Sequence, residues 1–256
     1  TEEMIKSQFP SVKIIHERKL GVSAARNKGI KVSNDDWIAL LDSDDEWHPT
    51  KLARQVDIWF NSSVPLRLIH TNEVWKKNNV HVNQMKKHKK MGGDIFSQCL
   101  FLCCISPSSA LIKKDVFQDF GYFDEDLPAC EDYDFWLRFC AKEEVLFINE
   151  DLIVKHGGHS DQLSQKYWGM DRFRVYALEK LINGGVLSTK NNKAAFEVLL
   201  KKINVLIKGG LNRKNFPLVD FYAKKREFWT NHRKQFKKSS KQAQFEEKEN
   251  FRYYFE

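Results

Sequence analysis

The first sixty residues alternate between strand-like and helix-like patterns, and this order limits the fold more than any other feature. A helical opening ends in a Pro-containing turn, after which a strand is expected around Val12–His16. The stretch after Gly21, "VSAARNKGIKVS", predicts a short helix, and a buried strand is expected over Trp37–Leu41. Pro49 suits the first turn of a further helix. This order predicts an α/β fold with a mixed, largely parallel sheet flanked by helices.

Apolar spacing predicts one buried helix face and one hairpin in this region. The helix after Pro49 carries apolar residues at i, i+4, i+7 and i+8, which predicts that they share a face toward the core. These residues are Leu52, Val56, Trp59 and Phe60. The stretch "RLIHTNEVWKKNNVHV" predicts two strands joined by a turn at Asn78 and Asn79.

From Tyr167 onward the pattern is helical. Gly184-Gly185 and Gly209-Gly210 stand where the first two helices should stop. We therefore expect an α/β domain over residues 1–166 and a helical extension with a basic tail over residues 167–256. The opening residues resemble the end of a helix with no strand before it. This favours the interpretation that a first strand–helix–strand unit is missing from the sequence.

Composition indicates a folded chain in a reducing setting. Apolar residues make up 42% of the 256 residues, which is enough to form a core. No apolar run reaches membrane-spanning length, and the start does not resemble a signal peptide, so a cytoplasmic location is expected. The five cysteines lack the paired CxxC spacing of a zinc site and are expected to be reduced and mostly buried.

The net charge of +8 is concentrated in two segments. Lys224–Lys241 has eight Lys or Arg residues against one acid, and Lys76–Lys90 has six lysines and no acid. Such segments attract phosphate, although a solvated face is the simpler explanation of each segment taken alone. No nucleic-acid-binding module accompanies the charge, so nucleic acid is not an expected partner.

Four acids follow the expected strand in "IALLDSDDEWHP": Asp42, Asp44, Asp45 and Glu46. Carboxylates this close raise one another's pKa, so either water in an exposed turn or a cation must offset their charge. Ligands of open α/β sheets bind beyond the carboxyl ends of strands, which is where these acids lie. A hard divalent cation held there can bridge two phosphates. A simple acidic loop is the alternative.

A second acidic site lies in "LPACEDYDFWLRF", where a helix is expected to begin near Glu131. Asp132 precedes an apolar stripe on this helix. The helix dipole favours its charged form while neighbouring aromatic rings desolvate it, which suits a general base. An N-terminal helix acid without chemistry is the alternative. Asp134 is expected to pair with Arg138, four residues on.

Two further motifs carry groups that can meet a metal or a phosphate. His156 and His159 flank two glycines in "VKHGGHSDQLS", where they could serve as ligands or simply be exposed. Arg26, in "SAARNKG", could meet a phosphate or a base, or could pair with a nearby acid.

Taken together, the sequence resembles the family 2 glycosyltransferases with the GT-A fold. The matching pieces are "GVSAARNKGI", "WIALLDSDDEWHPTKL", "GYFDEDLPACEDYDFWLRF" and "KHGGHSDQLS". The resemblance covers about residues 1–167 and excludes the later helices. Family members begin with a strand bearing a Pro-x-Tyr/Phe-Asn segment and later carry an Asp-rich turn that reads the base. Neither occurs in this sequence.

The resemblance implies transfer of a sugar from a nucleotide-diphosphate sugar, usually with inversion. On this interpretation Asp42 and Asp44, with Asp45, hold the ribose and a Mn²⁺ or Mg²⁺ on the diphosphate. Arg26 and one of the two histidines support the diphosphate. The candidates for the metal are Asp44, Asp42, His159 and His156.

The same resemblance implies roles for the second acidic site. Asp132 would deprotonate an acceptor hydroxyl, and Glu131 would orient the acceptor, which in related proteins is a glycan or a lipid-linked sugar. Assembly of cell-surface polysaccharide or glycolipid is the pathway implied. The basic tail, with Phe221, Phe228, Trp229 and Phe236, would rest on an anionic membrane. The alternative is a shortened, non-catalytic remnant that acts as a binding module.

Overall fold

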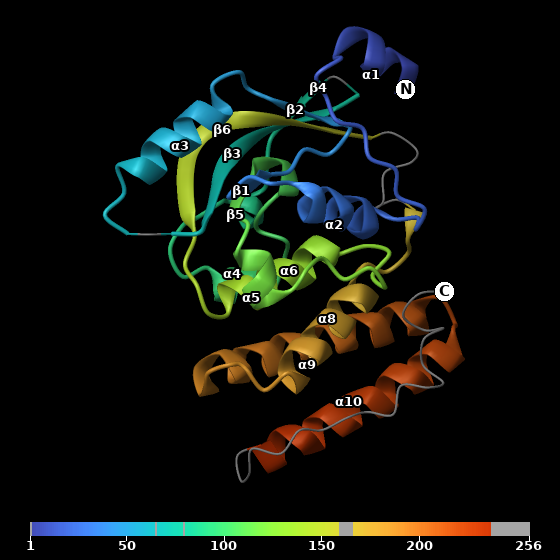
Figure 1. Cartoon of the computed structure of the whole chain (residues 1–256). Helices are drawn as coiled ribbons and strands as arrows, with labels where there is room; N and C mark the ends of the chain where they lie inside the picture. The colour runs from blue at the N-terminus through green and yellow to red at the C-terminus, as the bar shows by residue number, and fades with distance from the viewer. Residues whose placement is uncertain (1, 65, 79, 159–165, 237–256) are drawn as a thin grey trace.

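The protein, seen here in a computed structural model, has a curved mixed sheet with helices on both faces and a layer of long helices beyond one face (Figure 1). Residues 2–64, 66–78, 80–158 and 166–236 are described. The strands are β1 (Trp37–Ala39), β2 (Asp45–Trp47), β3 (Leu68–Lys77), β4 (Val80–Val82), β5 (Leu111–Lys113) and β6 (Leu146–Gly157). The expected α/β class, a mixed sheet flanked by helices, is confirmed.

The helices surround this sheet and continue past it to form the C-terminal layer. In the first part they are α1 (Glu2–Gln8), α2 (Val22–Val32), α3 (Lys51–Phe60), α4 (Phe96–Cys99), α5 (Val116–Phe120) and α6 (Glu131–Cys140), with two 3-10 turns, η1 (Lys86–His88) and η2 (Pro107–Ser109). The later helices are α8 (Asp171–Asn183), α9 (Thr189–Asn212) and α10 (Phe216–Phe236). None of these described helices combines the length and apolar character needed to cross a bilayer.

The strand order is β1-β5-β3-β6-β2, and β4 pairs with β3 outside this path. Only β3 and β6 pair in parallel among the described strands, while the other pairs are antiparallel. The expectation of a largely parallel sheet is therefore wrong. Parallel pairing needs a crossover between neighbouring strands, and the segment from β3 to β6, which carries α4, α5 and α6, provides one. Strands β1 and β3 also point the same way, but the antiparallel β5 lies between them.

The strand expected at Val12–His16 is also absent, because this segment forms no ladder and its side chains are exposed or half-buried. The β-hairpin is confirmed, with Asn78 in the left-handed region at a φ of 50°. Asn79 lies outside the described residues.

Apolar side chains pack on both faces of the sheet. The larger cluster lies on the side of α2, α5 and α6 and continues through α8, α9 and α10. Phe135 of α6, Phe173 of α8 and Trp229 of α10 all belong to it. A smaller cluster under α3 contains Ile69 and Leu152. The proposed boundary at residue 166 stays a prediction, although side chains from both sides of it share one core.

The apolar face predicted for α3 is wrong at three of its four positions, and only Trp59 packs against the cluster of Ile69 and Leu152. Leu52, Val56 and Phe60 are 40%, 52% and 80% exposed, whereas Lys51 and Gln55 are fully buried. The physical reason is that Gln55 Nε2 donates to the carbonyl oxygens of Ile69 (3.3 Å) and Ser109 (2.9 Å). Buried carbonyl groups need partners, so the polar side of the helix faces the sheet.

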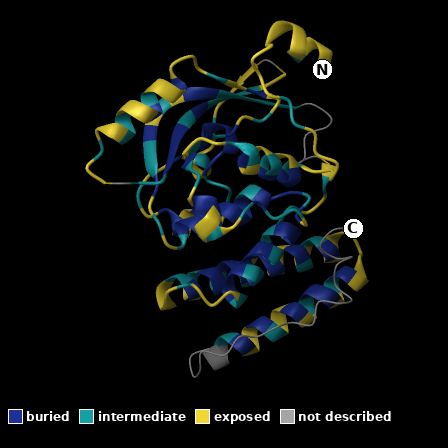
Figure 2. Ribbon diagram, viewed as in Figure 1, coloured by how far each residue is buried: buried dark blue, intermediate teal, exposed yellow. Residues whose placement is uncertain are grey.

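Two expectations about the C-terminal helices also need correction. Helix α9 continues past Gly209-Gly210, where a Cβ on Gly210 would lie 2.8 Å from Val219 of α10, so glycine permits close packing there instead of ending the helix. Phe221 and Trp229 are buried, so they face the core and not a membrane. Figure 2 shows buried segments recurring along α10. The expected state of the cysteines is confirmed, since all five are free and three are buried.

Candidate active site

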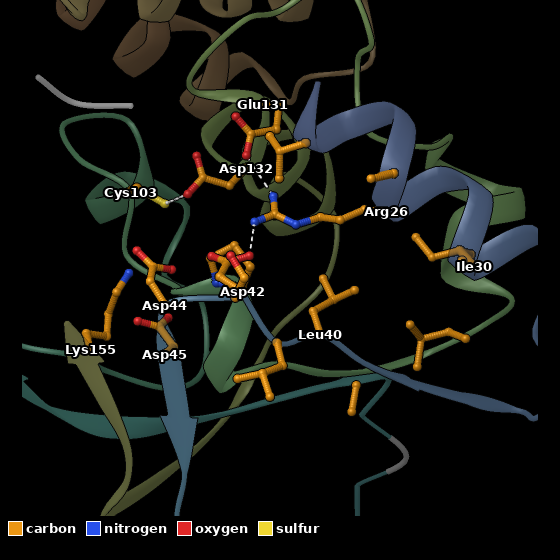
Figure 3. A pocket seen from close by; sticks show the side chains of 18 of the residues that line it. Arg26, Ile30, Leu40, Asp42, Asp44, Asp45, Cys103, Glu131, Asp132 and Lys155 are labelled. Carbon is orange, nitrogen blue, oxygen red and sulfur yellow. Dashed lines mark hydrogen bonds and ion pairs between the residues drawn. The ribbon is translucent and has the colours of Figure 1, made fainter. Parts of the chain in front are cut away.

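A pocket of about 960 Å³ opens between α2, the end of β1, the acidic turn after it and the start of α6 (Figure 3). Its charged or titratable lining residues are Arg26, Asp42, Asp44, Asp45, Glu131, Asp132, Lys155, His156 and Arg174, and its apolar ones include Ile30, Ile38, Leu40 and Ala129. The structure therefore brings together the sequence-predicted site residues, except His159, which lies outside the described residues.

The acidic turn is held in place by Ser108 of η2. The Asp42 backbone N–H donates to Ser108 Oγ (3.0 Å), and that hydroxyl donates to Asp45 Oδ2 (2.6 Å). Trp47 Nε1 donates to the Ser108 carbonyl (2.8 Å), which ties β2 to the same residue. Asp44 is exposed at the pocket, while Asp45 is buried at the start of β2. The turn thus presents one acid outward and uses another as an anchor.

Asp45 has one unsatisfied oxygen. Its Oδ1 is buried without a hydrogen-bond partner among the described residues. Burial raises the pKa of Asp45, with the nearby charges of Asp42 and Asp44 acting in the same direction, while Lys155 and the Ser108 hydroxyl lower it. This carboxylate can therefore accept a further donor or a cation at the floor of the pocket.

Lys155 of β6 is a cation that sequence reasoning missed. It lies opposite Asp45 in the antiparallel β2–β6 register, and Figure 3 shows its side chain extending toward Asp44 and Asp45. Burial lowers the pKa of Lys155, but the carboxylates of Glu73, Asp45 and Asp42 outweigh it and raise the pKa above its ordinary value. Glu73, one of these carboxylates, is also paired with the buried Lys90 (3.0 Å).

Arg26 of α2 connects the two acidic motifs. Its Nη1 donates to Glu131 Oε1 (2.7 Å), and its Nη2 donates to Asp42 Oδ1. The guanidinium also lies 5.4 Å from the Phe123 ring centroid. Of the alternatives considered for Arg26, pairing with a nearby acid is the contact that the structure shows. The crowded acids are thus partly offset by cations of the chain itself.

Helix α6 begins at Glu131, as predicted, directly after Cys130 in the left-handed region (φ 64°). Non-glycine residues adopt this conformation uncommonly, and here it turns the chain so that Glu131 and Asp132 both line the pocket. Burial, followed by the charge of Asp132, raises the pKa of Glu131 to about 7 against the opposing effect of Arg26. The predicted Asp134–Arg138 pair is present (2.9 Å).

Asp132 has two donors in the structure. The Tyr133 backbone N–H donates to its Oδ1 (2.6 Å), and the Cys103 thiol donates to its Oδ2 (3.0 Å). Burial and then the Asp132 charge raise the pKa of Cys103 well above its usual range, so the group is a thiol that can donate. Cys103 was not predicted as a site residue, and no sequence signal brings it near Asp132.

His156 lines the pocket, and its Nε2 lies 2.8 Å from Glu46 Oε1. The fourth acid of the turn therefore faces the end of β6 and leaves the pocket floor to the aspartates. The strand register explains this contact. Glu46 lies opposite Val154 in the β2–β6 pair, and His156 is two residues further along β6, on the same face.

The acids suit a cation that takes most of its ligands from a bound anion. Among the described residues no group of three or more His, Cys, Asp or Glu side chains is arranged to hold a metal by itself. Mg²⁺ is commonly bound by one or two carboxylates together with substrate phosphates and water. The exposed Asp44 and the unsatisfied Oδ1 of Asp45 fit that coordination.

Comparisons with known proteins agree with this arrangement. The model of the family "Glycosyl transferase family 2" matches residues 1–121. An uncharacterised glycosyltransferase of Rickettsia felis is 25% identical over 183 residues, covering 65% of this chain and 28% of that protein. Another, from Methanocaldococcus jannaschii, is 30% identical over 164 residues, covering 60% and 54%. The chain thus spans about a quarter to a half of these two relatives.

A solved structure supports the fold. The crystal structure of S. aureus TarS in complex with UDP-GlcNAc superposes with a TM-score of 0.59 at 15% identity, covering 79% of this chain and 59% of that one. The architecture is accordingly GT-A-like. The family match over residues 1–121 indicates that this part of the chain is similar to family 2 glycosyltransferases.

Proposed function

We propose that the protein transfers a sugar from a nucleotide-diphosphate sugar to an acceptor hydroxyl, with inversion at the anomeric carbon. The observation that carries the proposal is the single pocket in which the acidic turn after β1 faces the first residues of α6. The turn provides carboxylates for a cation and the ribose, and the helix provides a carboxylate for a proton. Transfer of a glycosyl group needs both functions side by side.

The donor would lie over the acidic turn. Asp42, Asp44 and Asp45 are proposed to hold the ribose and a Mn²⁺ or Mg²⁺, with His156 and His159 as further candidates for the metal. The metal would supply positive charge to offset the charge on the departing diphosphate. Lys155 and Arg26 add fixed positive charge beside these acids.

Asp132 would act as the general base. Its carboxylate would take the proton of the acceptor hydroxyl as that oxygen attacks the anomeric carbon opposite the leaving diphosphate, which gives inversion. The Cys103 and Tyr133 donors hold the carboxylate in one orientation. Glu131, fixed by Arg26, would orient the acceptor.

The acceptor is proposed to be a glycan or a lipid-linked sugar in cell-surface polysaccharide or glycolipid assembly. The proposed location is cytoplasmic, with peripheral contact to the inner face of the membrane. Lys237, Lys238 and Lys241 of the basic tail lie outside the described residues.

Donor binding is tested by thermal shift with UDP, GDP, dTDP and CMP, each with and without Mn²⁺. A nucleotide that stabilises the protein only with metal, and fails with Asp44→Ala, supports the donor site and names the base. The exposed Asp126→Asn serves as control and should behave like the wild type. If no nucleotide stabilises the wild type, the proposed donor site is wrong for this chain.

Chemistry is tested by donor turnover in Asp132→Asn. This variant should bind the nucleotide like the wild type and lose transfer by about 10²–10⁴-fold, the usual contribution of a general base. Wild-type nucleotide binding without any turnover would contradict transfer and favour the binding-module alternative.

A further inference from the structure

The hairpin surface, defined as Lys76–Asn78 together with Val80–Lys89, combines exposed lysines with exposed apolar side chains. Lys77, Lys86, Lys87 and Lys89 are exposed, and the sequence between Lys76 and Lys89 contains no acid. Val80, Val82 and Met85 are 67%, 37% and 57% exposed. A solvated basic face needs no such apolar side chains, and a combination of both is typical of surfaces that bind membranes.

Strand register places Val80 and Val82 on one face. Val82 lies opposite Trp75 and Val80 lies opposite Lys77 in the β3–β4 pair, and directly opposite residues project to the same side. The ring centroids of His88 in η1 and Trp75 in β3 lie 4.8 Å apart. Gln84 Nε2 donates to the Glu73 carbonyl (2.7 Å), which fixes the loop between β4 and η1. The surface is therefore a supported part of the fold.

This surface adjoins the mouth of the pocket. In the parallel β3–β6 pair, Lys76 is in register with His156 and Lys77 with Gly157. His156 and Lys155 line the pocket. A flat anionic partner held by the hairpin would thus lie beside the rim at which the acceptor would enter, an arrangement that rests on the proposed function.

We propose that the hairpin surface binds the anionic face of a phospholipid bilayer, with Val80, Val82 and Met85 entering the headgroup region and the lysines meeting lipid phosphates. Charge complementarity favours this partner, because an anionic leaflet attracts each nearby lysine. The exposed apolar side chains favour a bilayer over a nucleic acid, whose phosphate backbone offers them no apolar contact.

Cosedimentation with vesicles tests the proposal, using phosphatidylcholine alone or with about one third phosphatidylglycerol. We expect the wild type to bind only the anionic vesicles. The variant Lys77→Glu/Lys86→Glu/Lys87→Glu should bind on the order of 100-fold more weakly. The matched control Lys190→Glu/Lys193→Glu/Lys208→Glu makes the same charge change on exposed positions of α9 and should bind like the wild type. Val80→Ser/Val82→Ser/Met85→Ser should weaken binding several-fold at high salt, where the charges are screened.

Three results with vesicles would overturn the inference: no preference of the wild type for anionic vesicles, equal losses in the hairpin and control variants, or loss only in Lys237→Glu/Lys238→Glu/Lys241→Glu. Hairpin-dependent binding of a DNA duplex without vesicle binding would overturn it as well. Nucleotide thermal shifts on the same preparations separate the two proposals. Failure to bind nucleotide contradicts the proposed function while the vesicle result stands on its own.

Discussion

At the scale of single residues, the pocket owes its shape to contacts between charged groups far apart in the sequence. Arg26 joins Asp42 to Glu131, and Lys155 faces Asp45 across two strands. These cations offset part of the acidic charge before any ligand binds, which answers why the turn tolerates so many carboxylates. The charge of Glu131 is still costly, because this carboxylate is buried beside Asp132.

Glu131→Gln should change how stability depends on pH. The pKa of Glu131 is about 7 in the folded chain against an ordinary 4.5, so between these values the folded state holds a proton that the unfolded state has lost. Stability from this group is therefore full below pH 4.5 and is lost as pH rises to 7. Relative to Glu131→Gln, the wild type should lose stability over this window in denaturant melts. Parallel curves would contradict the assignment, and the exposed Glu144→Gln is the control.

Cys103→Ala should slow transfer by removing one hydrogen bond to Asp132. A thiol is a weak donor, so a loss of about 1 kcal/mol, roughly five-fold in kcat, is expected with little change in donor KM. Cys103→Ser keeps a donor at this position and should restore most of the rate. An equal loss in both variants would instead indicate a packing role for the sulfur.

At the scale of elements, α3 shows how a helix can face its sheet with polar side chains. Lys51 Nζ donates to Gln55 Oε1 (2.9 Å) and lies 4.4 Å from the Trp47 ring centroid. Trp47 in turn bonds to Ser108, which anchors the acidic turn. The inward face of α3 thus supports the floor of the pocket, while its apolar outward face is left exposed.

Lys51→Met should stabilise the protein at neutral and lower pH. Burial lowers the pKa of Lys51 from 10.5 to about 7, so between these values the unfolded chain binds a proton that the folded chain does not, and wild-type stability rises with pH. Lys51→Met removes the cost of charging a buried amine, and this gain is expected to exceed the about 1–3 kcal/mol lost when Gln55 Oε1 loses its donor. The gain should be largest at pH 7 or below and should shrink toward pH 10.5.

Urea unfolding at pH 6, 8 and 10 measures this effect. Lys190→Met, at an exposed site on α9, is the control and should show no such trend. A gain for Lys51→Met that grows with pH would show that the buried amine is not the cause.

At the scale of the whole molecule, the long C-terminal helices support the domain that carries the pocket. Lys180 of α8 lies 2.8 Å from Asp134 of α6. Lys202 of α9 contacts Asp171 (3.0 Å) and the carbonyl of Phe101 (3.1 Å), which follows α4. These contacts connect α8 and α9 to α6, which carries Asp132, and to the segment after α4, which carries Cys103.

Lys202→Met should destabilise the protein by about 1–3 kcal/mol, because the Phe101 carbonyl and Asp171 lose a charged partner. The neighbouring Lys201→Met, at an exposed position, should cost much less. Denaturant unfolding gives the difference, and nucleotide binding should persist in both variants. Equal stability of the two would mean that this contact does not tie α9 to the rest of the molecule.

The acidic turn and the start of α6 were predictable from sequence because each depends on local order along the chain. Acids after an apolar run and a Glu-Asp pair before an aromatic stripe are visible without any tertiary contact. The hairpin at Asn78 and the Asp134–Arg138 pair depend on equally short spacings. The prediction that a first strand–helix–strand unit is missing stays a prediction. Among the described strands, β1 pairs only with β5.

Sequence alone thus determined the fold class, the two acidic motifs and their proximity to a strand end and a helix start. Tertiary structure decided which charges meet. The pocket contains Lys155 and Cys103, and its acidic turn is anchored by Ser108, only because β6, the segment after α4 and η2 converge there. The spacing of these residues along the chain does not predict that they meet. The burial of Lys51 and Gln55 is of the same kind, since hydrogen bonding to buried carbonyls outweighed the apolar pattern of α3.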